Sequence, residues 1–186
     1  PTPSKSSAPI SMPTPIPTPT PTPTPPPPSP KPPEKPLIIS SAAFNYGAAI
    51  PDEYSCNGIN YSPALSISGI PEGTKSLALI LDDPDAKQVV GYTWIHWIVW
   101  NISPSATYIA QGSAPSGATE GTTSFGSVGY GGPCPPSGTH KYYFKLYALD
   151  VPTLNLGSSA NSAALQNAMK GHILKQATLM GTYTAK

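Results

Sequence analysis

Proline is distributed so unevenly that it divides the chain into two parts. Seventeen of the 27 prolines lie in the first 36 positions, where they alternate with threonine over a long stretch. A segment with so few apolar side chains cannot bury enough surface to fold, and it is expected to be an extended, solvated polyproline II chain. We interpret residues 1–36 as a Pro/Thr-rich disordered stalk or linker, with a Pro-rich ligand for a partner domain as the alternative. Residues 37–186 are expected to form one domain with a real core.

The charges of residues 37–186 exclude one class of partner. This part of the chain contains seven lysines, eight acidic residues and no arginine. It therefore has no basic patch and no side chain for bidentate phosphate contacts, so no nucleic-acid partner is expected. No run of 18 apolar residues occurs, so no transmembrane segment is expected in this chain. No cofactor is expected either.

The apolar pattern of the domain is mainly that of β-strands, with Pro and Gly between the elements. The run at residues 76–82 is apolar up to its last residue, which is typical of a strand covered on both faces. The candidate strands are residues 37–40, 42–46, 76–82, 93–102 and 141–149. Residues 104–132 are rich in Gly, Ser, Thr and Ala, so we expect long loops there, and such loops are often functional.

One helix is expected in the last part of the chain. Asn161 or Ser162 can cap a helix over residues 163–170, and the apolar pattern could extend it to Leu174 despite Gly171. The expected fold class is therefore mainly β, with a C-terminal helix and long loops.

Two of the three histidines stand near the starts of the two strongest candidate strands. Side chains alternate along a strand, so Trp94 and His96 should share one face with Ile98 and Trp100. All three tryptophans fall within seven residues, and core packing is the ordinary explanation for them. Trp94 is the exception, because it lies beside a histidine near a loop and could line a pocket.

The second histidine follows a loop rich in Gly and Pro. His140 and Tyr142 share a face by the same alternation, and the glycines of residues 129–138 could let backbone N–H groups approach an anion. Asp83 ends an apolar strand, so its carboxylate could hold a histidine protonated or bind an ammonium group. For Asp85 we expect a structural role in a turn.

The two cysteines give a clue to the cellular compartment of the protein. Cys56 and Cys134 could form a disulfide, or they could be two separate thiols. Disulfides persist in oxidising compartments, and a Pro/Thr stalk before a domain is the layout of a surface-tethered protein. We therefore expect an extracellular or cell-surface location, with any signal or anchor outside this chain.

Several motifs in order resemble the phosphatidylethanolamine-binding protein family, in its bacterial and archaeal branch called Raf-kinase-inhibitor-like. The strongest matches are DPDA from Asp83, WIHW from Trp94 and GPCPPSGTHKY from Gly132. The sequence departs from the family pattern at Ile67, Lys87 and Lys141, which leaves the pocket motifs intact.

The resemblance implies a sandwich of antiparallel β-sheets with a small anion pocket near one end. Such a pocket holds phosphate, phosphorylethanolamine or similar groups. The residues that match the family's pocket are Asp83, Trp94, His96, His140 and Tyr142, and the adjoining loop matches at Gly132 and Pro133.

We interpret the domain as a non-enzymatic binding module for a small phosphorylated or anionic ligand, such as a phospholipid head group. The resemblance also implies a regulator of the inhibitor type, with a kinase or a protease as its partner. Two alternatives remain. Cys134, His140 and Asp83 are the residue types of a thiol hydrolase, and His96, His140 and Asp83 could hold a metal ion.

Overall fold

The computed structural model describes residues 35–186. The predicted Pro/Thr-rich stalk falls outside the described residues up to position 34. Its character, and the domain boundary after residue 36, therefore stay predictions. Within residues 35–186 no helix is both long enough and apolar enough to cross a membrane.

The domain is built from two antiparallel sheets and a few short helices. The smaller sheet has the strand order β1-β2-β5, and the larger has the order β6-β4-β3-β7-β8. The strands are β1 (Ile38–Ser40), β2 (Leu65–Ser68), β3 (Ser76–Asp83), β4 (Trp94–Ile102), β5 (Tyr108–Ile109), β6 (Thr119–Glu120), β7 (Thr139–Leu149) and β8 (Ile173–Thr184). The helices are a 3-10 turn η1 (Asp52–Tyr54), α1 (Lys87–Val90) and α2 (Ser162–Met169).

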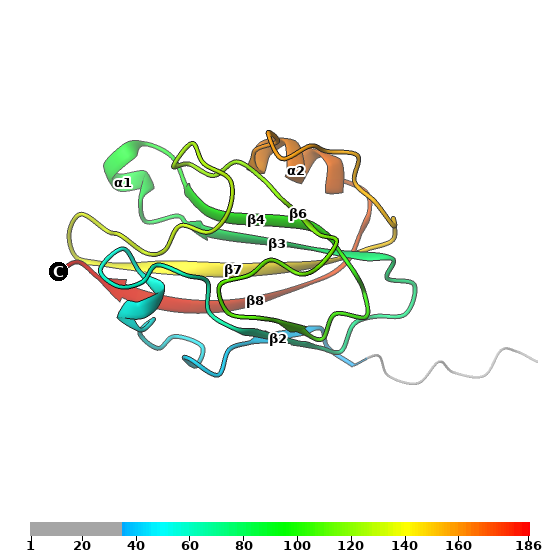
Figure 1. The fold of residues 1–186 in the computed structure, drawn as a ribbon, viewed down its shortest axis with the longest axis horizontal. Coiled ribbons are helices and arrows are strands. Elements are labelled where there is room, and N and C mark those ends of the chain that lie inside the picture. Colours follow the sequence, from blue (N-terminus) through cyan, green and yellow to red (C-terminus); the bar gives the residue numbers. More distant parts are fainter. Residues whose placement is uncertain (1–34) are drawn as a thin grey trace, which may run out of the picture. The chain divides into compact units, whose positions relative to one another are not determined.

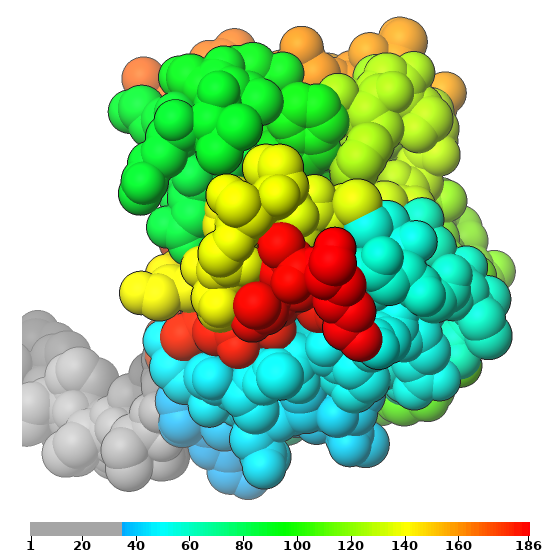
Figure 2. Space-filling model, turned by 90° about the vertical axis from the view of Figure 1, so that its left-hand side faces the viewer, coloured from blue at the N-terminus to red at the C-terminus, as the bar shows by residue number. Residues whose placement is uncertain are grey.

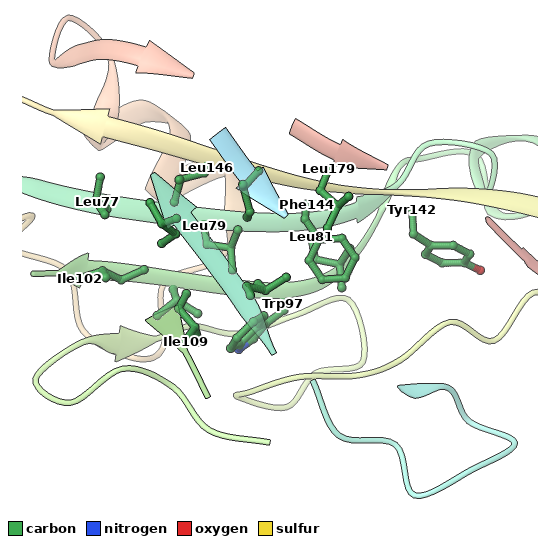
Figure 3. Packing of buried hydrophobic residues seen from close by; sticks show 14 of the residues in the cluster. Leu77, Leu79, Leu81, Trp97, Ile102, Ile109, Tyr142, Phe144, Leu146 and Leu179 are labelled. Carbon is green, nitrogen blue, oxygen red and sulfur yellow. The ribbon is translucent and has the colours of Figure 1, made fainter. Parts of the chain in front are cut away.

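The central strand β3 is buried along its whole length, as its apolar sequence predicts. One of its faces meets the small sheet across a core that contains Leu77, Leu79 and Leu81 (Figure 3). The other face places Ala78 and Ile80 against α2 and the segment before it. The molecule is thus layered as small sheet, large sheet and helix, and the predicted fold class, mainly β with antiparallel sheets, is confirmed.

Two predicted elements differ in the structure. Residues 42–46 form turns rather than a strand. Helix α2 ends at Met169 because Lys170 has an extended conformation and Gly171 has a φ of 84°, a left-handed value that ends helices. Ile173 and Leu174 therefore begin β8, a 12-residue strand paired with β7, and not a further turn of helix.

Strand β4 contains an irregularity that changes which side chains share a face. Leu81 pairs with Trp97 and Asp82 pairs with Ile95, so β4 advances two residues while β3 advances one. His96 is the extra residue, which is the arrangement of a β-bulge. Trp94 and His96 consequently lie on the side of Trp97, and the prediction that they share a face with Ile98 and Trp100 is wrong.

Candidate functional site

A small cavity lies at the end of the sandwich where β3 ends and β4 and β7 begin. We call it the histidine cavity. Its volume is about 240 Å³, and its wall consists of Asp83, Ala86, Val89, Val90, Trp94, His96, Phe125, Cys134, Pro135, Pro136, His140 and Tyr142. Figure 1 shows α1 and the C-terminus at this end of the long strands and α2 toward the other. Figure 2 looks onto the same end, where the segment around α1 (green) lies above the loop before β7 (yellow).

Asp83 and His140 form a buried hydrogen bond in the wall. Oδ2 of Asp83 lies 2.7 Å from Nδ1 of His140, and the two residues are 3% and 7% exposed. The other oxygen, Oδ1, accepts a hydrogen bond of 3.1 Å from the backbone N–H of Ala86. Both carboxylate oxygens are therefore occupied, and Asp83 holds His140 rather than standing free for a ligand. Because Nδ1 of His140 is bonded to Asp83, Nε2 is the ring nitrogen that can contact a ligand.

The imidazole of His96 is held in one tautomer. Its Nδ1 lies 2.6 Å from the carbonyl oxygen of Gly131, and a carbonyl can only accept, so Nδ1 must carry the proton. The N–H of Gly131 in turn donates to the carbonyl of His96. Burial lowers the pKa of His96 below the usual imidazole value, although the bond to Gly131 and the charge of Asp83 act the other way. In its neutral form this histidine presents Nε2 as an acceptor, and in its protonated form as a donor.

Tyr142 brings a hydroxyl group to the cavity wall. Its ring lies edge-on to that of His96, with 5.2 Å between the ring centres. Figure 3 shows its hydroxyl pointing away from the other labelled core residues. That hydroxyl is buried and makes no hydrogen bond of normal geometry to any residue in the described part of the chain. Burial, reinforced by the charge of Asp83, raises the pKa of Tyr142 well above its usual value, so the group stays a neutral O–H donor.

The structure thus brings Asp83, Trp94, His96, His140 and Tyr142 around one cavity. Gly132 and Pro133, also predicted for the site, do not line it. The N–H of Gly132 donates to Oδ1 of Asn60 at 2.7 Å, and the carbonyl of Pro133 accepts from the N–H of Cys56. They hold the loop against residues 54–60.

The prediction that glycine amides of this loop form an anion nest does not fit at two positions. The N–H groups of Gly131 and Gly132 are already bonded, to the carbonyl of His96 and to the side chain of Asn60. A side chain is also excluded at both, because a Cβ would lie 2.4 Å from the ring of Phe125 and 2.2 Å from the carbonyl of Tyr54 respectively. These glycines allow close packing of the loop rather than access for an anion.

Sequence reasoning missed the apolar part of the wall. Val89 and Val90 belong to α1, and their exposed fractions are 55% and 42%. Phe125 lies edge-on to both Trp94 and His96, at 5.3 and 5.4 Å between ring centres. It comes from the predicted long loop, where the only signal was one phenylalanine flanked by Ser and Gly, without any periodic pattern.

Two structural observations bear on the alternative activities. Cys56 and Cys134 form a disulfide that joins positions 78 residues apart, so Cys134 has no thiol in this form. Among residues 35–186, no three His, Cys, Asp or Glu side chains are grouped so as to hold a metal ion. The thiol-hydrolase and metal-site alternatives therefore have no support in the geometry.

Comparisons with known proteins agree on one family. The sequence profile described as phosphatidylethanolamine-binding protein matches residues 40–184. The chain is 45% identical over 150 residues to a UPF0098 protein of Methanothermobacter thermautotrophicus, covering 78% of this chain and 97% of that protein. It is 49% identical over 147 residues to a UPF0098 protein of Chlamydia muridarum, with the same two coverages of 78% and 97%.

Solved structures give the same answer. A phosphatidylethanolamine-binding protein homologue of Chlamydia trachomatis, CT736, superposes with a TM-score of 0.77 at 44% identity, covering 81% of this chain and 99% of that one. YbcL of Escherichia coli, described as a new member of the mammalian family, superposes with a TM-score of 0.76 at 33% identity and the same coverages. The chain therefore belongs to the phosphatidylethanolamine-binding protein family.

Proposed function

We propose that the domain is a non-enzymatic binding module whose histidine cavity takes the phosphorylated head group of a phospholipid. The observation that carries the proposal is that two imidazole rings in the cavity wall are each fixed in orientation by a hydrogen bond at Nδ1. Nδ1 of each is bonded to a fixed acceptor, Gly131 O or Asp83 Oδ2, so each ring can direct only Nε2 toward a ligand. When protonated, both Nε2 atoms donate, and the Tyr142 hydroxyl adds a third donor, because it lies close to Asp83 and Cys134 but makes no hydrogen bond of normal geometry to either. Three convergent donors suit the oxygens of a phosphate group.

The composition of the wall supports a head group that is attached to an apolar body. The cavity volume of about 240 Å³ is small for a small-molecule site, for which about 300–1,000 Å³ is usual. Its mouth carries Val89, Val90 and Phe125, which are between 42% and 55% exposed. Tyr92 stacks on Trp94 beside them. A free phosphate would leave this apolar rim in water, whereas the chain region of a phospholipid would cover it.

The wall also supports a binding role rather than catalysis. None of its twelve residues is a Ser, Thr or Lys, and its one cysteine is bonded to Cys56. Both oxygens of Asp83 already accept a hydrogen bond, from His140 and from Ala86, which favours a positioning role for this carboxylate. If the domain regulates a kinase or protease, as the resemblance implies, the exposed rim is the surface that such a partner would contact.

We also propose that the protein works outside the cytoplasm. The disulfide supports an oxidising compartment, where such a bond persists. The Pro/Thr-rich composition of residues 1–36 is compatible with a spacer between a surface and the domain.

The test is an NMR titration of the isotope-labelled protein with phosphorylethanolamine at pH 6 and pH 7.5. We expect shifts confined to residues around Asp83, Trp94 and His140, stronger at pH 6 because anion binding requires protonated imidazoles. The shifts should vanish in the His96→Ala, His140→Ala double variant. His172→Ala is the matched control, since this histidine bonds to Asp150 and lies outside the cavity.

A second arm separates the head group from the whole lipid. Sedimentation with phosphatidylethanolamine vesicles should recover the wild-type protein, whereas Val89→Ser, Val90→Ser should stay in solution and keep its response to phosphorylethanolamine. No shift at millimolar phosphorylethanolamine in a folded wild-type protein would refute the head-group proposal. Equal binding of the rim variant to vesicles would remove the role of the apolar rim.

A further inference from the structure

A second cavity lies on the opposite face of the five-stranded sheet, and we call it the polar cavity. Its volume is about 790 Å³, and it is lined from β3, β4 and the two residues before it, β7, the N-terminal half of α2 and residues 122–124. Consecutive residues divide between the two cavities: Asp82, Ile95 and Ser124 line the polar cavity, while Asp83, His96 and Phe125 line the histidine cavity. The two cavities are therefore back to back, and a ligand of one cannot reach the other.

An ion pair of zero net charge, with a buried carboxylate and a partly exposed lysine, lies in the wall of the polar cavity. Nζ of Lys145 lies 2.5 Å from Oδ2 of Asp82, which is 6% exposed. Oδ1 of the same carboxylate is buried and has no hydrogen-bond partner among residues 35–186. Burial raises the pKa of Asp82 although Lys145 acts in the opposite direction, so the ion pair does not fully replace the lost hydration. One acceptor oxygen and two ammonium protons remain for a ligand.

The rest of the wall offers both donors and acceptors. Ser124 Oγ accepts from the N–H of Ile95, and Ser162 Oγ accepts from Gln166 Nε2, so both hydroxyl protons are left to donate. Thr122 and Thr123 donate their hydroxyl protons to backbone carbonyls, at 3.1 and 3.0 Å. Thr122 keeps its oxygen lone pairs, whereas Thr123 Oγ1 also accepts from the N–H of Phe125 and keeps one. No residue of this wall other than Asp82 and Lys145 carries a charge.

We propose that the polar cavity binds a neutral polyhydroxylated ligand, a sugar or a polyol. A ligand hydroxyl both donates and accepts, so two neighbouring hydroxyls can satisfy Asp82 Oδ1 and Lys145 Nζ together. An anion would instead meet a buried carboxylate, and a cation would meet the ammonium group. Tyr92, 52% exposed, is part of the wall and stacks on Trp94 by one face, so an edge or the other face of its ring is what it can offer to the apolar side of a sugar. The volume lies within the usual range of about 300–1,000 Å³ for small-molecule sites.

The experiment is an NMR titration of the full chain with glucose, N-acetylglucosamine and myo-inositol, each to tens of millimolar. We expect at least one of the three to shift the signals of Thr93, Thr123 and Ser162 while those of Asp83 and His140 stay in place. The Asp82→Asn, Lys145→Met double variant removes both charges and so leaves no unpaired ion in the sheet. It should weaken the binding by about tenfold or more, because two charge-assisted hydrogen bonds are lost.

A second variant keeps the test independent of the ion pair. Ala163→Phe fills the cavity from an exposed helix position and should also abolish the shifts, whereas Gln88→Ala, on α1 and outside the polar cavity, should leave them unchanged. Absence of shifts with all three compounds would overturn the proposal, and so would shifts that persist in both cavity variants. Neither result depends on whether phosphorylethanolamine binds the histidine cavity.

Discussion

At the scale of single residues, the two cavity histidines differ in what their fixed nitrogen meets. Nδ1 of His140 faces a carboxylate, which can stabilise a positive charge, whereas Nδ1 of His96 faces a neutral carbonyl. Burial then lowers the pKa of His96. The surroundings of His96 therefore oppose its protonation, so this histidine makes the stability of the fold depend on pH, and also the affinity for an anion if the proposed function holds.

The first prediction concerns His96 and acid stability. Below the unfolded pKa of about 6.5, the unfolded chain takes up a proton that the folded chain does not, so acidification favours unfolding. The contribution of His96 to stability is present above about pH 6.5 and is lost as the pH falls through the lowered folded pKa. We expect the free energy of unfolding to decline over this window by up to about 1.4 kcal/mol per pH unit for this one group.

Urea unfolding between pH 7.5 and pH 5 measures that slope. His96→Asn removes the titrating ring and keeps a donor for Gly131, so the slope should become shallower. The matched control is His172→Asn, which removes a partly exposed imidazole outside the cavity. An equal loss of slope in the two variants would contradict the assignment to His96.

The second prediction concerns Tyr142→Phe. A buried hydroxyl without a partner costs about 1–3 kcal/mol, so its removal should leave the free energy of unfolding unchanged or raise it within that range. The affinity for phosphorylethanolamine should fall by about three- to tenfold, which corresponds to the net free energy of one ordinary hydrogen bond. Denaturant unfolding and calorimetric titration measure the two effects, with Tyr143→Phe as the control on the opposite face. A clear loss of stability at unchanged affinity would mean that the hydroxyl has a structural partner.

At the scale of elements, the loop before β7 is fixed from several sides. The disulfide joins it to the turn at Cys56, and Asn60 holds Gly132. The same turn is bonded to the end of β8, because Tyr183 accepts from Ser55 and Asn57 and donates to Asp52. Pro135 and Pro136, in the cavity wall, therefore stand on a loop with little freedom.

The third prediction follows from this cross-link. It closes a loop of 78 residues, and removal of such a disulfide typically costs about 2–5 kcal/mol. We expect Cys56→Ser, Cys134→Ser to unfold at a lower urea concentration by a corresponding amount, as should the reduced wild-type protein. Reductant should have no effect on the double variant. An unchanged midpoint for wild-type protein whose thiols titrate as fully reduced would show that the cross-link adds no stability.

The elements also mark where sequence reasoning succeeds and where it ends. The run at residues 76–82 predicts β3 because burial on both faces requires five consecutive apolar side chains, from Leu77 to Leu81. The bulge at His96 leaves no such trace, since it depends on pairing with β3 and on Gly131, far along the chain. The contribution of Phe125 to the cavity is equally hidden, because it comes from loop packing over a glycine. The motifs could thus name Asp83, Trp94 and His140 as neighbours of one cavity, but not its apolar rim.

At the scale of the whole molecule, the five-stranded sheet contributes side chains to two cavities, one on each of its faces. The larger sheet packs against the small sheet on one side and against α2 on the other. The histidine cavity lies on the side of the small sheet, and the polar cavity lies on the side of α2, with Ser162 and Gln166 of that helix in its wall. Asp82 and Asp83, adjacent in sequence, belong to different cavities because a strand sends successive side chains to opposite faces.

The fourth prediction concerns the chain as a whole. If residues 1–34 form a solvated stalk, their deletion should change the melting temperature by no more than about 2 °C and leave binding of phosphorylethanolamine unchanged. Scanning calorimetry of the full chain and the shortened chain tests this. A loss of more than about 1 kcal/mol would mean that the N-terminal residues pack on the domain.

The bulge has a genetic consequence. Because His96 is an extra residue between Ile95 and Trp97, a strand without it could keep its pairs with Asp82 and Leu81. Deletion of one in-frame codon would therefore remove this imidazole from the cavity, and the strand pairs on either side could stay in register. In an alignment of related genes such a change would appear as a single-position gap rather than a substitution.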